Sequence, residues 1–189
     1  AGLVALAGYF AVLFVPAPGA AKRLIFFAIP LAGLVFVLGL GNLLKKRSDG
    51  VLREIAVVFG VIGFAVMNVM AVVQLSIHIW MNQGQPASAD AAVQEMAAWV
   101  RRSVNAVHLG LGVSFDIFVL SSIGLFAALM IRNPRFGLVL GASGLAIAAA
   151  MLILNLWAFP VPPEPDLGPL AGLWLGAVAV RMLAMARRA

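Results

Sequence analysis

The sequence predicts an all-α, polytopic membrane protein, in which residues 1–189 form a single transmembrane domain of six helices. Hydrophobic residues make up 63% of the chain and charged residues only 11%, whereas soluble domains are about 25% charged. The apolar residues fall into blocks of roughly 20, which is the length of helix that crosses a bilayer. Lys and Arg gather at the ends of these blocks, so we interpret the net charge of +6 as an orientation and lipid-headgroup signal. The lipid bilayer, rather than nucleic acid, is the expected partner.

Prolines, glycines and charged runs separate the apolar blocks. The predicted helices cover residues 1–15, 23–44, 51–81, 101–131, 136–158 and 167–185. The first block is only about 22 Å long at 1.5 Å per residue, so we expect that helix to begin before Ala1. Pro30 lies inside the second block and predicts a kink.

The connection between the third and fourth helices is the longest. Within it, residues 91–99 have helical spacing and one apolar side. We expect a short interfacial helix here, a possible lid, which continues or bends into the fourth helix.

The distribution of cationic residues predicts the topology. The larger group lies on one side of the six spans: Lys45, Lys46, Arg47, Arg53, Arg132, Arg135, Arg181, Arg187 and Arg188. The smaller group, on the other side, is Lys22, Arg23, Arg101 and Arg102. The positive-inside rule therefore places both termini in the cytoplasm and residues 82–100 outside.

Small residues recur at helical spacing in the last two helices. The two stripes are Gly137, Gly141, Gly144 and Ala148, and Gly168, Gly172 and Gly176. Such stripes let helix backbones approach closely in lipid, so we expect tight packing within the bundle; the alternative is the interface of a homodimer.

The C-terminal third also carries a resemblance. Its three pieces are Asn-Pro-Arg-Phe-Gly at 133–137, Leu-Ile-Leu-Asn-Leu-Trp-Ala-Phe-Pro-Val-Pro-Pro at 152–163, and Asp-Leu-Gly-Pro-Leu at 166–170 followed by Gly-Leu-Trp at 172–174. Together they resemble a group of small uncharacterised bacterial membrane proteins. The resemblance implies a location in the bacterial inner membrane and a six-helix plan, but no activity and no functional residues.

The most informative polar residue is Asp116, which lies well inside the fourth apolar block. An acid at that depth costs at least about 2.5–3.5 kcal/mol on insertion scales, so we expect it to have a partner and a function. Distances along the helices were taken from Ala56, Arg132 and Phe136 as cytoplasmic boundaries. On that scale Asp116 lies about 24 Å in, Gln74 ~27 Å, Asn155 ~28 Å, His78 ~33 Å and His108 ~36 Å. With Arg101 at the outer helix end, these residues are the candidate ligand-binding set, in a pocket that opens outward.

Each candidate has a structural alternative. Asp116 could be a protonated packing residue bonded to Asn155 or a serine, instead of a residue that binds a ligand, cation or proton. His78 and His108 could be interfacial side chains, or the two axial ligands of a b-type haem. Arg101 fits a headgroup anchor or an anion clamp. A metal site formed by His78, His108 and Asp116 is stereochemically possible, but Asp116 lies about 12 Å deeper than His108, which disfavours it.

No phosphate-binding loop, nucleophile elbow or Walker-type motif is present, and the absence of Cys excludes thiol chemistry. We therefore expect a non-enzymatic protein, either an accessory subunit of a larger membrane complex or a binder of a small lipophilic ligand. The alternatives are a haem-carrying electron-transfer protein and a small transporter or channel that uses Asp116.

Overall fold

The computed structural model describes residues 19–45, 50–83, 90–159, 163 and 167–187. These residues form five helices: α2 (Gly19–Leu44), α3 (Gly50–Gln83), α4 (Ala91–Ile131), α5 (Leu138–Ala158) and α6 (Gly168–Ala186). Each is long and apolar enough to cross a membrane. The prediction of an all-helical fold is thus confirmed for the described residues, and their apolar helices fit a membrane protein. The first predicted helix, residues 1–15, lies outside them, so the count of six stays a prediction.

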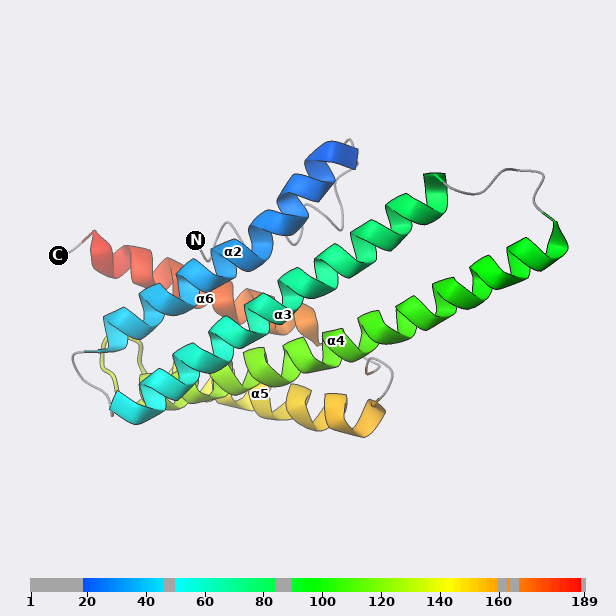
Figure 1. Cartoon of the computed structure of the whole chain (residues 1–189). Helices are drawn as coiled ribbons and strands as arrows, with labels where there is room; N and C mark the ends of the chain where they lie inside the picture. Colours follow the sequence, from blue (N-terminus) through cyan, green and yellow to red (C-terminus); the bar gives the residue numbers. More distant parts are fainter. Residues whose placement is uncertain (1–18, 46–49, 84–89, 160–162, 164–166, 188–189) are drawn as a thin grey trace.

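Neighbouring helices in the chain pack against one another as up-and-down pairs (Figure 1). The α3–α4 pair is the most extensive, followed by α4–α5, α2–α3 and α5–α6. Helix α6 also reaches α2, since a side chain at Gly39 would lie 3.8 Å from the terminal methyl of Met182. The core between the helices contains fully buried apolar side chains, including Leu40, Leu120 and Val178. Helix α2 continues through the buried Pro30.

Helix α4 is much longer than a membrane requires. Its 41 residues correspond to about 61 Å, whereas the hydrocarbon core of a bilayer is about 30 Å thick. Helix α5, with 21 residues, matches that thickness. Helices α3 and α4 therefore run past the ends of the others (Figure 1), and we call the protruding residues 71–83 and 91–110 the distal extension. Residues 91–99 are continuous with α4, which is one of the two forms that the sequence left open; their position at a membrane interface stays a prediction.

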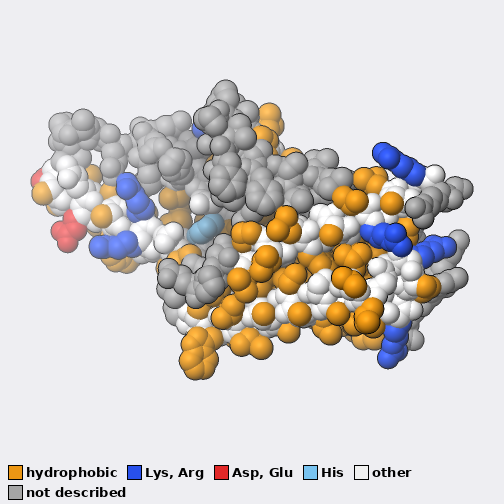
Figure 2. All heavy atoms as spheres, turned by 180° about the vertical axis from the view of Figure 1, so that it is seen from behind, with side chains coloured by type: hydrophobic (Ala, Val, Ile, Leu, Met, Phe, Trp, Pro, Cys, Tyr) orange, Lys and Arg blue, Asp and Glu red, His pale blue; other side chains and the backbone are white. Residues whose placement is uncertain are grey.

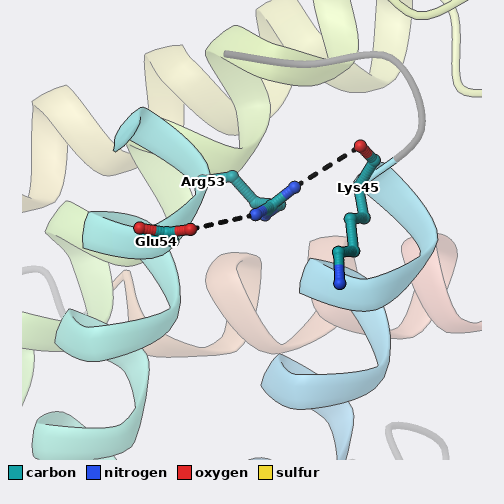
Figure 3. Close-up of polar contacts among 3 residues, drawn as sticks. All are labelled: Lys45, Arg53 and Glu54. Carbon is teal, nitrogen blue, oxygen red and sulfur yellow. Dashed lines mark hydrogen bonds and ion pairs between the residues drawn. The ribbon is translucent and has the colours of Figure 1, made fainter. Parts of the chain in front are cut away.

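The opposite end of the bundle is basic. Lys and Arg gather there beyond an apolar body, while the distal extension carries charges of both signs (Figure 2). We call it the basic end and define it by Lys45, Arg53, Arg132, Arg135, Arg181 and Arg187. Arg53 links the first turn of α3 to the end of α2, because its guanidinium donates to the Lys45 carbonyl at 3.4 Å and contacts Glu54 at 3.2 Å (Figure 3). The predicted clustering of cations is present; which side of a membrane it faces stays a prediction.

Two of the predicted glycine contacts on α5 are confirmed. A side chain at Gly141 would lie 2.7 Å from the backbone nitrogen of Ile131 on α4, and one at Gly144 would lie 2.6 Å from the indole nitrogen of Trp174 on α6. Gly137 does not belong to this stripe. It precedes α5 with φ of 86°, and a Cβ at this residue would meet nothing within 4 Å, so its role is to turn the chain into the helix.

Further close contacts were not anticipated from the sequence. Gly33 and Gly41 on α2 lie against Phe64 and Val57, and Gly60 and Gly63 on α3 lie against α2 and α4. Gly60 and Gly63 are three residues apart, a spacing that also occurs in the α5 stripe, so the same search would have found them. Gly33 and Gly41 are eight residues apart with Val37 between them, so that search would have missed them.

Candidate ligand-binding site

A cavity of about 340 Å³ lies between the helices and takes residues from all five of them. Its walls are apolar and largely aromatic on one side, with Phe36, Phe64 and Phe115 contributing rings. Of the described residues that line it, Asp116 on α4 and Asn155 on α5 carry the polar side chains. A volume above about 300 Å³, apolar walls and a few polar groups are typical of small-molecule sites.

The packing of α4 on α5 brings Asp116 and Asn155 to the same level. A Cβ at Gly124 would lie 3.5 Å from that of Ala148, which fixes the register of the antiparallel pair. Asp116 lies eight residues before Gly124 and Asn155 seven residues after Ala148, so both are about 11–12 Å along from this contact in the same direction. The predicted common depth of these two residues is confirmed.

Asn155 is the most deeply buried polar group of the site, with 1% of its surface exposed. Its amide nitrogen donates to the carbonyl of Met151, one turn earlier in α5, at 3.0 Å. Its Oδ1 is buried and has no hydrogen-bond partner within the described part of the chain. The wall of the cavity thus contains a hydrogen-bond acceptor that the described protein groups leave unused.

The aromatic wall is held by packing on both sides. The rings of Phe64 and Phe115 meet edge to face with centroids 6.2 Å apart, which is a favourable arrangement for aromatic pairs. Gly33 lies directly beneath the Phe64 ring, and any side chain there would overlap it. These wall residues were not predicted, because apolar residues in a membrane helix carry no signal of which ones border a cavity.

Two glycines of the α6 stripe, Gly168 and Gly172, also line the cavity. The sequence pattern predicted them to be contact residues for close helix packing. In the structure both border the cavity at the first turns of α6, and their role in close helix packing stays a prediction.

The prediction that Gln74 lies near Asp116 is wrong, and the register of α3 explains why. Gln74 is exposed and does not line the cavity. Ser122 on α4 donates to the carbonyl of Ala56 at 2.7 Å, so Ala56 lies level with Ser122 and not with Arg132. Counting depth from Ala56 therefore placed Gln74 about 15 Å too close to the basic end.

Among the other candidates, His108 lies about 12 Å from Asp116 along α4. It is half-buried, it hydrogen-bonds the backbone of Met70 on α3, and its Nδ1 has no partner among the described residues. The side chain of His78 lies outside the described residues. On the α3 backbone, however, His78 is eight residues beyond Met70, or about 12 Å. The two histidines are therefore not opposite one another, and the register does not favour a haem held between them.

Arg101 is exposed on the distal extension. It lies several helical turns of α4 before Asp116, a cavity residue on that helix. No group of three or more His, Cys, Asp or Glu side chains suited to a metal occurs in the described ranges. Of the six candidate residues, the structure brings together Asp116 and Asn155.

No protein-family model, no curated protein and no solved structure matches this chain. The resemblance of its C-terminal third to bacterial membrane proteins stays a prediction. Its function is consequently inferred from the geometry of the site.

Proposed function

We propose that this protein is a membrane-spanning binder of a small lipophilic ligand, which occupies the cavity between the five helices. The observation that supports this most directly is the combination of apolar walls with Asp116 and Asn155 at one level. An empty apolar cavity costs packing contacts, and a buried acceptor without a partner costs free energy. A ligand with an apolar body and one polar head offsets both costs.

The arrangement of α2 and α6 supports entry from the bilayer. The two helices approach each other at Gly39 and Met182 and diverge from there (Figure 1), and both contribute to the walls of the cavity. We propose that a lipophilic molecule dissolved in the membrane enters from the side of the bundle that α2 and α6 form. We place the basic end in the cytoplasm of a bacterial cell and the cavity toward the outer face of the inner membrane, as the positive-inside rule favours.

Two neighbouring residues of α6 provide a matched test. Gly172 lines the cavity, whereas Leu173 is 55% exposed on the outside of the bundle. Gly172→Phe fills the cavity, and Leu173→Phe adds a similar ring where lipid would surround it. Binding of a fluorescent hydrocarbon-tailed molecule is measured with each protein in nanodiscs.

We expect Gly172→Phe to weaken binding at least about tenfold, or 1.4 kcal/mol, and Leu173→Phe to bind as wild type. Met67→Trp, on the opposite wall of the cavity, repeats the test from α3. Wild-type binding in both cavity-filling variants would contradict the proposed function.

A further inference from the structure

The chemistry of the cavity wall restricts the head group of the ligand. We propose, on the basis of the proposed function, that the ligand carries a hydrogen-bond donor, an ammonium or a hydroxyl group, which contacts Asn155 and Asp116. A head that can only accept hydrogen bonds, such as an ester or a carboxylate, does not fit this wall.

The orientation of the Asn155 amide follows from its own helix. Its nitrogen lies 3.0 Å from the Met151 carbonyl oxygen and donates to it. Rotating the amide by 180° would place Oδ1 against that carbonyl, where two acceptors repel each other and neither has a proton to share. The oxygen is therefore the side-chain atom that is left for another donor, and it has no partner within the described residues.

The burial of Asn155 makes this oxygen selective. Asn155 is 1% exposed and its Oδ1 is covered by neighbouring atoms, so a ligand donor reaches this oxygen only when the side chains around it shift. Once made, that hydrogen bond gains more than it would at a wet surface. A ligand that brings only acceptors leaves Oδ1 unpaired and adds a second buried acceptor beside it. A site built around a polar group discriminates strongly against a ligand that cannot pair with that group.

Asp116 adds acceptor capacity at the same level. A carboxyl group keeps acceptor oxygens whether or not it is protonated. An ammonium head has three donors, enough for both residues, whereas a hydroxyl head has one. The hydrocarbon part of either ligand would lie along the apolar walls, which include Phe64, Phe115 and Met67.

The test compares compounds with the same ten-carbon chain: decylamine, decanol, methyl decanoate and decanoate. Each displaces the fluorescent hydrocarbon-tailed molecule from the protein in nanodiscs of uncharged lipid, and displacement is compared at equal mole fraction in the membrane. We expect decylamine and decanol to displace it at concentrations at least about tenfold lower than the other two, a difference of 1.4 kcal/mol. This preference is measured on the wild-type protein and requires no variant to fold.

Three substitutions then assign the preference to residues. Asn155→Leu removes the acceptor and should abolish the advantage of both donors. Asp116→Asn removes the carboxyl group and should weaken decylamine more than decanol, because an ammonium gains more from a carboxylate than a hydroxyl does. Asn68→Leu is the control, because Asn68 is half-buried on α3 and does not line the cavity; its displacement profile should match wild type.

Failure of the donor assignment and failure of the proposed function give different results. Equal displacement by all four compounds, or a preference for decanoate, would overturn the donor assignment and leave ligand binding intact. Oδ1 would then be bonded to water or buried without a partner. Displacement curves that are unchanged in Gly172→Phe would instead overturn the proposed function itself.

Discussion

Gly144→Ala tests how closely α5 and α6 are packed. The Cβ of the new alanine would lie 2.6 Å from the indole nitrogen of Trp174, which is too close for two non-bonded atoms. That indole is 4% exposed and donates to the carbonyl of Leu140 at 2.8 Å, so it has little freedom to move. Overpacking of this kind costs about 1–3 kcal/mol, and loss of the indole hydrogen bond adds about 1 kcal/mol.

An alanine also stabilises a helix relative to glycine, by about 0.8–1.0 kcal/mol, and this gain must be separated from the clash. Gly110→Ala supplies the control, because no atom lies within 4 Å of the Cβ position at Gly110. Gly124→Ala is a second control with an ordinary contact of 3.5 Å to Ala148. After the common helix gain is subtracted, Gly144→Ala should be less stable than Gly110→Ala by about 2–4 kcal/mol.

The free energy of unfolding is measured by titrating sodium dodecyl sulfate into mixed micelles and following helix content by circular dichroism. A Gly144→Ala protein as stable as Gly110→Ala would refute the reasoning. Trp174→Phe provides a further check, since a smaller ring without the hydrogen bond relieves part of the clash. The two substitutions together should therefore cost less than the sum of their separate effects.

Three further predictions concern stability, register and topology. Ser122→Ala removes the buried hydrogen bond to the Ala56 carbonyl and should lower the free energy of unfolding by about 1 kcal/mol in the same titration. Phe59 and Phe118 have ring centroids 5.8 Å apart, so in this cysteine-free chain a Phe59→Cys/Phe118→Cys protein should form a cross-link with a short bifunctional reagent; a failure would contradict the register of α3 on α4. Glu95→Cys should react with a membrane-impermeant maleimide added outside intact cells, and labelling only after lysis would reverse the proposed orientation.

The features that follow from the composition of single helices could be predicted from the sequence. Apolar block lengths predicted the five described helices with ends within about four residues, a normal margin for such boundaries, except that α4 begins at Ala91. Depth along α4 and α5 was also predictable, because Arg132 and Phe136 lie at the two sides of one short turn. Depth along both helices can therefore be counted from that turn, and this count places Asp116 and Asn155 at the same level.

The register of α3 could not be obtained in this way. No comparable marker ties Ala56 to Arg132, and the sliding position of two apolar helices depends on which side chains interlock. In the structure, Val119 packs against Gly63 and Ser122 packs against Gly60. The Phe64 ring meets that of Phe115. Hydropathy does not select these contacts, because residues of the same types occur at many other positions of the two helices. The error in the level of Gln74 arises from this step, and not from its helix assignment.

The glycines show the same limit where function is concerned. Gly144 and Gly172 each belong to a stripe of small residues at helical spacing, and the sequence pattern predicted the same packing role for both. Gly144 is closed by the indole of Trp174, whereas Gly172 borders open volume. Spacing along the helix does not distinguish the two cases, because the neighbouring helices decide whether a side chain fills the space beside a glycine. Gly172 lies in the wall of the cavity that also includes Asp116 and Asn155, so substitutions at Gly172 should alter binding before they alter stability.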